Sequence, residues 1–191
     1  MTTVITGMAE LIDVSLESHM NALAGRIRQV RFVHSLEAMA LSAVCSTLDD
    51  ARVMFPFGHS RTGVYLGIDD AIEDIKDEYF TPILREGILG ASPLLFPYTS
   101  PNALAAQISI AFDVRGESIT LPITSSVTDV LQYGADCVAG EYTESAIIGA
   151  IFCHRSQRSA SPYRCEFYFI ESEASALKRG VHIYCSIGLR K

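Results

Sequence analysis

The sequence predicts an α/β domain with helices layered on a mixed β-sheet, and two observations lead to this class. First, β-rich runs alternate with helical patterns along the chain, as they do in layered α/β proteins. Second, the run from Ser145 to Cys153 is almost continuously apolar, which is typical of a strand covered on both faces. With 191 residues, of which 49% are apolar and 19% charged, we expect one domain with a sizeable core over residues 1–191.

The first third of the chain is predicted to hold a strand followed by two helices. Residues 3–8 form a β-rich run that Gly7 closes. Ser15 precedes a run of apolar residues at helical spacing, and Gly25 can end that helix in a left-handed conformation. A second helix is expected over residues 35–51, where apolar residues again recur at helical spacing.

The middle of the chain is predicted to contain a strand, a long amphipathic helix and a second helix. The strand covers residues 62–68. Asp69-Asp70 is a candidate cap for a helix over residues 71–86, which Pro82 is expected to kink or shorten. The next helix is expected over residues 102–111.

The C-terminal half is predicted to be richer in strands. One strand is expected over residues 118–123. Pro122 has no N–H to donate to a sheet, so the end of this strand belongs at an edge or a bulge. The remaining predicted elements are a helix over 126–139, the apolar strand over 145–153, and strands over 165–170 and 181–187 on either side of a short helix over 172–179.

Charge and composition exclude several classes of function. The formal charge of −7 disfavours nucleic acid and anionic membranes as partners. The five cysteines show no C-x-x-C spacing, which indicates reduced thiols, and we expect neither a metal nor a cofactor. We find no signal peptide and no apolar run long enough to span a bilayer, so a cytoplasmic location is expected. The mean hydropathy of +0.24 indicates either a sheet covered on both faces or apolar surface meant for a partner.

Several motifs follow one another in the order found in a single enzyme family. They are VITGM at residues 4–8, RTGVYLG at residues 61–67, a helix that opens P-N-x-x-A at Pro101, the dipeptide Arg115-Gly116, and CEFYFIESEASALKRGVHIYCSIG at residues 165–188. In this order and spacing they resemble the N-terminal half of a β-ketoacyl synthase, of the thiolase-like superfamily. The resemblance implies a thiolase-like half-fold, with a mixed five-stranded sheet layered with helices. It also implies that the C-terminal half, which carries the family's catalytic histidines, is absent from this chain.

The position of the family's nucleophile is degenerate in this sequence. In the family, the strand after Arg-Gly delivers a reactive cysteine into a tight turn before the next helix. Counting without gaps from Pro97 places Ser125 at that position, and a gap of one residue would place Thr124 there. A hydroxyl is too weakly acidic to attack without an adjacent base, so we expect no catalytic residue. Alternatively, Ser125 or Ser126 simply caps the helix that follows.

The resemblance also implies which surfaces meet a partner. The strand after Arg-Gly pairs across a twofold axis with another subunit in the family, which assigns that role to Ser118, Ile119, Thr120, Leu121, Pro122 and Ile123. The turn before the P-N-x-x-A helix would reach the partner's acyl tunnel, which assigns that role to Leu94, Leu95, Phe96 and Pro97. Alternatively, Leu95 and Phe96 are ordinary core residues.

Together these features resemble a truncated, non-catalytic subunit of the chain-length-factor type. Such a subunit would form a heterodimer with a full-length β-ketoacyl synthase in polyketide, aryl polyene or fatty-acid-type chain elongation. It would shape the acyl tunnel of that enzyme and meet the acyl carrier protein only indirectly. Two alternatives are a weak Ser/Thr-dependent acyltransferase or thioesterase, and a homodimeric acyl-binding module that uses the strand edge on itself.

Overall fold

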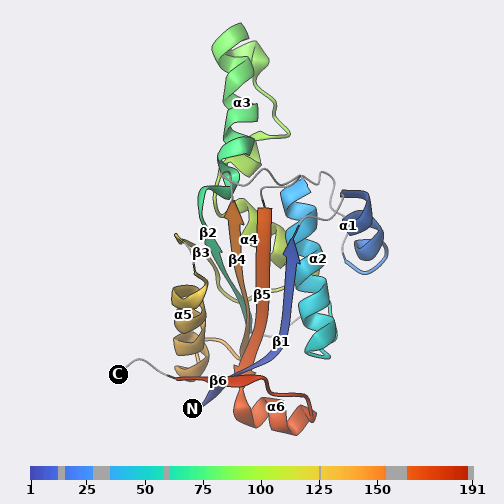
Figure 1. Ribbon diagram of the computed structural model, residues 1–191, viewed down its shortest axis with the longest axis vertical. Helices are drawn as coiled ribbons and strands as arrows, with labels where there is room; N and C mark the ends of the chain where they lie inside the picture. The colour runs from blue at the N-terminus through green and yellow to red at the C-terminus, as the bar shows by residue number, and fades with distance from the viewer. Residues whose placement is uncertain (13–15, 28–34, 58–60, 125, 154–162, 189–191) are drawn as a thin grey trace.

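The computed structural model describes residues 1–12, 16–27, 35–57, 61–124, 126–153 and 163–188. Within this part of the chain, one six-stranded sheet has the strand order β3-β2-β4-β5-β1-β6, with helices on both faces (Figure 1). The strands are β1 (Thr3–Ile12), β2 (Thr62–Ile68), β3 (Ser118–Pro122), β4 (Ser145–Cys153), β5 (Tyr163–Ser172) and β6 (Cys185–Ile187). The helices are α1 (Leu16–Leu23), α2 (Ser35–Asp50), α3 (Glu73–Glu86), α4 (Ala103–Phe112), α5 (Thr128–Ala139) and α6 (Glu173–Arg179), and there are 3-10 turns η1 (Asp70–Ile72), η2 (Gly87–Gly90) and η3 (Phe96–Thr99).

The sheet is mixed, as the sequence predicts. Strand β2 runs parallel to both β3 and β4, whereas the β4–β5, β5–β1 and β1–β6 pairs are antiparallel. The sheet has six strands where five were expected, because β6 pairs with residues 3–5 of β1 and forms an additional strand. The strand expected over residues 181–187 is confined to its last three residues. Gly180 adopts a left-handed conformation, and the Val181 N–H still donates to the last turn of α6.

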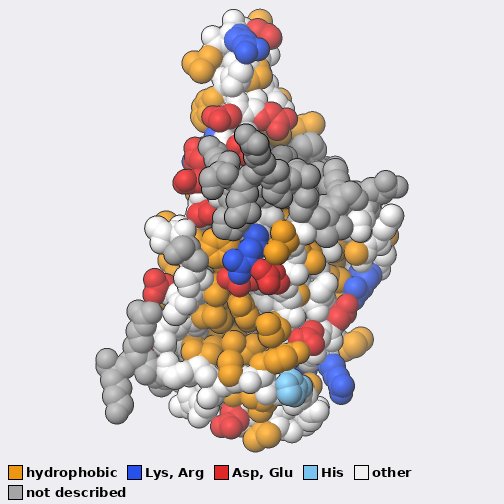
Figure 2. All heavy atoms as spheres, in the orientation of Figure 1, with side chains coloured by type: hydrophobic (Ala, Val, Ile, Leu, Met, Phe, Trp, Pro, Cys, Tyr) orange, Lys and Arg blue, Asp and Glu red, His pale blue; other side chains and the backbone are white. Residues whose placement is uncertain are grey.

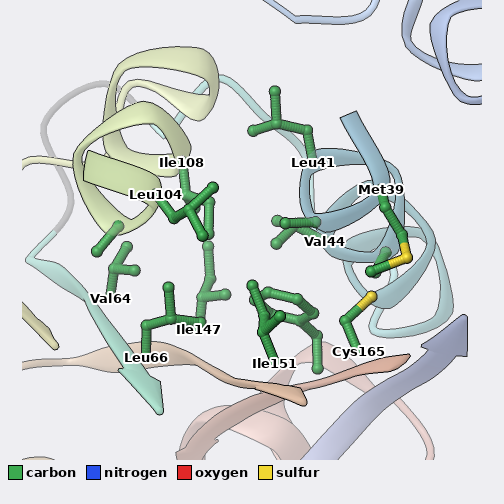
Figure 3. Close-up of a cluster of buried hydrophobic side chains, with 14 of the residues drawn as sticks. Met39, Leu41, Val44, Val64, Leu66, Leu104, Ile108, Ile147, Ile151 and Cys165 are labelled. Atoms are coloured by element: carbon green, nitrogen blue, oxygen red, sulfur yellow. The ribbon is translucent and has the colours of Figure 1, made fainter. Parts of the chain in front are cut away.

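The core lies on both faces of the sheet. Strand β4 is buried along all of its inner residues, which confirms the prediction made from its apolar run. Helices α2 and α4 cover one face, and their side chains interdigitate with those of the central strands (Figure 3). Each fully buried Leu or Ile there contributes about 1.5–3 kcal/mol. The labelled members of this cluster are Met39, Leu41, Val44, Val64, Leu66, Leu104, Ile108, Ile147, Ile151 and Cys165.

Helix α5 covers part of the other face. Its apolar side chains, among them Val130 and Val138, pack on Tyr65, Ile148 and Ile170 of the sheet. On the face turned to the viewer in Figure 2, apolar side chains form a patch with charged side chains above it. Helices α2 and α4 therefore cover one face of the sheet, and helix α5 covers the other face only in part.

Helix α3 stands beyond the ends of the strands and forms an arm with the chain that returns from it (Figure 1). We call residues 73–99 the arm. The helix continues through Pro82 to Glu86, so Pro82 does not shorten it, and the kink expected as the alternative stays a prediction. The capping role expected of Asp69 is also wrong, because its carboxylate instead accepts the Cys153 N–H over 2.9 and 3.0 Å. This contact ties the base of the arm to the end of β4.

Candidate functional site

The strand predicted to bind a partner, β3, lies at the edge of the sheet. It runs parallel to β2, with Thr120 opposite Leu66. Pro122 is its last residue, which confirms the edge position predicted from the missing N–H. Ile123 lies just beyond β3, and its N–H still donates to the Ile68 carbonyl over 3.1 Å.

Backbone groups alternate along β3 between its two sides. On the inner side, the Val64 N–H donates to the Glu117 carbonyl over 2.7 Å. Successive residues of a strand point their N–H and C=O groups in opposite directions, so Ile119 and Leu121 also face β2. The residues that turn their backbone groups to the outer edge are therefore Ser118, Thr120 and Pro122.

The side chains of β3 divide between the two faces of the sheet. Ile119 and Leu121 are half-buried and pack against the cluster under α5. Thr120 lines a hollow at the base of the arm together with Lys76 and Pro101. Its hydroxyl oxygen is buried and makes no hydrogen bond within the described part of the chain. No residue of the strand is charged, so β3 lacks the charges that commonly prevent edge-to-edge pairing.

The turn after β3 opens into a hollow of about 400 Å³ that Ile123, Thr124, Ser126 and Asp129 help to line. Thr124 is exposed there, whereas Ser125 lies outside the described residues. The Ser126 hydroxyl accepts the Thr128 N–H over 3.1 Å and also hydrogen-bonds the Thr128 hydroxyl over 2.6 Å. Ser126 therefore satisfies the first N–H of α5, but the N-cap position belongs to Val127 and not to Ser126, so the capping alternative is wrong for Ser126.

The charge at the start of α5 is negative. A helix N-terminus carries a partial positive charge that stabilises an anion, and this is one reason why a cysteine placed there ionises. In this chain Asp129 lies in the first turn of α5 and supplies a carboxylate to that end of the helix. A second anion, whether a thiolate or an enolate, would be repelled by this carboxylate.

The cysteines of the chain lie elsewhere, and most are buried. Burial raises the pKa of the Cys45 and Cys137 thiols, and it raises the pKa of Cys165 to about 12. These thiols are therefore protonated near neutral pH. Cys137 and Cys165 are thus buried, as their apolar sequence patterns predict, whereas the same expectation is wrong for Cys185, which is exposed.

The Arg-Gly dipeptide brings the start of β3 against β2. A Cβ atom at Gly116 would lie 2.2 Å from the Thr62 carbonyl oxygen, so only glycine fits there. Beside it, the Tyr65 hydroxyl donates to the Glu117 carboxylate over 2.8 Å. Burial raises the pKa of Tyr65, and the hydrogen bond to Glu117 raises it further. Sequence reasoning missed this anchor because the two residues are 52 positions apart and neither belongs to a motif.

The turn expected to face a partner's tunnel lies at the root of the arm. Leu94 and Phe96 are 62% and 61% exposed, Pro97 is exposed, and Leu95 is half-buried. The alternative that Phe96 is a core residue is therefore wrong. Its ring lies against Tyr79 of α3, with ring centroids 5.9 Å apart, and this contact holds the returning chain to the helix.

Tyr98 fixes this turn to the body of the domain. It is buried against α2, where it hydrogen-bonds Glu37, and its burial and that contact raise its pKa to about 12. Beyond this anchor, large apolar side chains lie at the surface of the arm (Figure 2). The most exposed of them are Leu84, Ile88 and Leu89, with exposures of 80% or more, and Phe80 is half exposed.

Within the described ranges, no group of three or more His, Cys, Asp or Glu side chains is placed to hold a metal ion. No helix in that part of the chain is long and apolar enough to cross a membrane.

Residues 12–150 match the family described as β-ketoacyl synthase, N-terminal domain. The chain belongs to this family. The match includes β2, β3, the turn after β3 and the whole of the arm. The family resemblance predicted from the motifs is thus confirmed.

Solved structures show that this β-ketoacyl synthase domain has the fold of its family. The ishigamide ketosynthase/chain length factor superposes with a TM-score of 0.74 and is 16% identical over 97% of this chain. The ketosynthase of a type II polyketide synthase, bound to a hexaketide and in complex with its acyl carrier protein, gives a TM-score of 0.73 at 15% identity over 97% of this chain. The ketosynthase from module 6 of the Bacillus subtilis bacillaene synthase gives 0.62 at 16% identity, again over 97%. The thiolase-like α/β fold is therefore confirmed.

The β-ketoacyl synthase domain described here spans only part of these relatives. It covers 62%, 61% and 40% of their respective chains. None of the curated protein sequences matches it.

Proposed function

We propose that this β-ketoacyl synthase-family chain is a non-catalytic subunit of the chain-length-factor type. It pairs with a complete β-ketoacyl synthase and shapes the acyl tunnel of that enzyme during polyketide, aryl polyene or fatty-acid-type chain elongation. The partner's cysteine then forms the carbon–carbon bond. The proposal is carried by the turn after β3, which contains hydroxyl side chains and a carboxylate and which counting along the sequence places at the family's nucleophile position.

The chemistry of this turn supports the proposal that the chain does not catalyse condensation. Condensation needs a nucleophile that carries the acyl chain and groups that stabilise the enolate. The Ser126 hydroxyl already accepts the Thr128 N–H, and Asp129 places negative charge in the first turn of α5. Among the described residues that line the hollow with Thr124, the one potential base is the Asp129 carboxylate. The hollow can hold a small group, and we propose that it does not activate a thioester.

Pairing with another subunit is supported by the edge and the arm. The outer edge of β3 offers unpaired backbone groups and no charge, which is the surface that a further strand adds to. The hollow at the base of the arm is lined by residues of both α3 and β3, so a subunit docked on the edge also meets the arm. The exposed Phe96 and Leu94 are then the apolar groups that limit the tunnel.

The test is co-expression of this chain with a complete β-ketoacyl synthase from the same genome. We expect the two chains to co-purify as a heterodimer that converts malonyl and acyl groups on acyl carrier protein into products of defined length, measured by mass spectrometry. Replacing Phe96 with Ala is expected to lengthen the products. The matched control is Ile110→Ala, because Ile110 is 55% exposed but lies on α4, outside residues 73–99.

Two outcomes would reject the proposal. One is a ketosynthase that is active alone and unchanged by this chain. The other is an acyl adduct on Thr124, Ser125 or Ser126 after incubation of this chain with acyl thioesters, which would favour the acyltransferase or thioesterase alternative.

A further inference from the structure

Helix α3 presents two sides that differ in character. Its inner side holds the returning chain, because Tyr79 packs against Phe96 with ring centroids 5.9 Å apart. A second side carries Asp77, Phe80 and Leu84, which follow one another at spacings of three and four residues and therefore lie in one row along the helix. All three are exposed, and Leu84 reaches 86%. We call these three residues the outer row.

The spacing within the outer row is that of a seam between two helices. Alternating steps of three and four residues give an average of about 3.5, the period at which the side chains of two α-helices interlock. An extended segment repeats every two residues and would not follow such a row. The outer row therefore favours an α-helix as its occupant.

The charge of the arm decides which helix fits. The arm contains five acidic and two basic residues, which give it a formal charge of −3, and Figure 2 shows acidic side chains gathered on it. Neither cation belongs to the outer row. Lys76 donates to Glu73 over 2.6 Å, and Arg85 lies about 100° round the helix from the end of the row. Within the described ranges Asp77 makes no hydrogen bond or ion pair, so a cation beside it gains a contact without breaking one.

A second copy of α3 does not meet these requirements. In a parallel pair the two Asp77 carboxylates would lie side by side and repel one another. In an antiparallel pair each Asp77 carboxylate would lie against the Phe80 ring of the other copy and would lose water without gaining a counter-charge. An anionic membrane is also unsuitable, because its surface potential has the same sign as the arm. The occupant must bring positive charge together with apolar side chains.

We infer that the outer row of α3 is a docking site for an α-helix of a partner protein, with a cationic residue opposite Asp77 and apolar residues opposite Phe80 and Leu84. The inference goes beyond the proposed function, because it uses neither the edge of β3 nor the turn at 94–97. Salt screens the ion pair but leaves the apolar contacts, so binding weakens at high salt without being lost.

Two synthetic peptides test the charge of the occupant. Both form amphipathic helices of about three heptads with leucine in the seam, and the remaining seam positions are lysine in one peptide and glutamate in the other. Fluorescence anisotropy measures the binding of each labelled peptide to the whole chain. We expect the lysine peptide to bind at least about 10-fold more tightly than the glutamate peptide at about 0.1 M NaCl. Equal affinities, or no binding of the lysine peptide, would overturn the inference.

Two charge reversals on the same helix test the position of the site. Asp77→Lys and Glu78→Lys change the net charge equally, but Glu78 lies about 100° round the helix from Asp77 and outside the outer row. We expect Asp77→Lys to weaken binding of the lysine peptide about 3- to 10-fold and Glu78→Lys to change it less than about 2-fold. Both side chains are exposed, and circular dichroism checks that both variants fold. Equal losses would show that net charge alone attracts the peptide, and would overturn the inference.

Leu84→Ser tests the apolar part of the outer row, with Ile110→Ser as the matched control because Ile110 is 55% exposed on α4. We expect Leu84→Ser to weaken binding of the lysine peptide about 5- to 10-fold and Ile110→Ser to leave it unchanged. Equal affinities of these two variants would overturn the inference. So would co-sedimentation of the wild-type chain with phosphatidylcholine vesicles that Leu84→Ser abolishes, because the row would then take a lipid surface. Each of these results leaves co-expression with a ketosynthase as a separate test of the proposed function.

Discussion

At the scale of single residues, the decisive feature for the proposed function is the turn after β3, where no cysteine stands at Thr124 or Ser125. A thiolate at a helix N-terminus is stabilised by the helix dipole and by the absence of nearby negative charge. Here the first turn of α5 carries Asp129, and Ser126 uses its hydroxyl to accept a backbone N–H. A thiol placed in this turn would therefore lie near a carboxylate, which disfavours its ionised form.

Restoring a thiol alone is consequently expected to give a poorly reactive cysteine. In Thr124→Cys, the carboxylate of Asp129 raises the pKa of the new thiol. Adding Asp129→Asn removes that charge, and the rate of alkylation by iodoacetamide at neutral pH is expected to rise about 2- to 5-fold, in line with about 0.3–1 kcal/mol for a charge at a helix end. Mass spectrometry of the peptide that contains residue 124 measures the extent of alkylation over time. Equal rates in the two variants would show that Asp129 has no influence on the site.

At the scale of elements, one buried ion pair joins four of them. The Glu171 carboxylate on β5 accepts two hydrogen bonds from Arg179, the last residue of α6, over 2.6 and 3.2 Å. It also accepts the hydroxyls of Thr6 on β1 and Ser175 on α6. Arg179 donates in addition to the Ala51 and Arg52 carbonyls just after α2. The Glu171–Arg179 pair therefore connects the end of the sheet to both α6 and the C-terminal end of α2.

Removing the arginine from this centre leaves a buried carboxylate without its counter-charge. Arg179→Ala is expected to lower the free energy of unfolding by about 3–5 kcal/mol, as for other broken buried ion pairs. Urea unfolding followed by circular dichroism measures the change. The control is Arg61→Ala, which removes an exposed pair with Glu144 and is expected to cost less than about 1 kcal/mol. If the two variants lost similar amounts of unfolding free energy, the hydrogen bonds around Glu171 would stabilise the fold no more than an exposed ion pair does.

Elements also show where local signals succeed and where they fail. Strands β2 and β4 begin and end where the sequence predicts, because their apolar runs are buried on both faces. The position of Pro122 predicted an edge strand, because a missing N–H is a local property. The caps of α3 were predicted wrongly, because Asp69 finds a partner on β4 that is 84 positions away in sequence.

At the scale of the whole molecule, stability depends on groups that stay protonated in the core. Burial raises the pKa of Cys165 from 9.0 to about 12 and that of Tyr168 from 10.0 to about 12. The folded chain therefore holds these protons more tightly than the unfolded chain does. Their contribution to stability is complete below about pH 9 and falls as the pH rises towards 12.

This linkage gives a measurable alkaline transition. The thermal unfolding midpoint is expected to be nearly constant from neutral pH to about pH 9 and to fall steadily above it. Cys165→Ala is expected to lower the midpoint at neutral pH, since it removes a buried side chain, and to reduce its slope above pH 9. Scanning calorimetry across this range provides the measurement. A slope that is the same in the variant and the wild-type chain would show that Cys165 is not part of the transition.

The sequence by itself determined the class of the fold, the order of its elements and the family to which it belongs. These depend on patterns that are local in the chain: apolar runs, helical spacing, and short motifs such as Arg115-Gly116. It also showed that no cysteine stands at Ser125 or Thr124, because this requires only counting along the chain.

Only the tertiary structure decided which groups meet. It added β6 as a sixth strand and exposed Phe96 at the root of the arm. It also determined that the backbone N–H and C=O of Thr120 point away from β2, towards the outer edge of the sheet. It also brought Glu171 and Arg179 together with the end of α2. Strand pairing and burial of charge join residues that are far apart in sequence, and their energies depend on neighbours that no local pattern specifies.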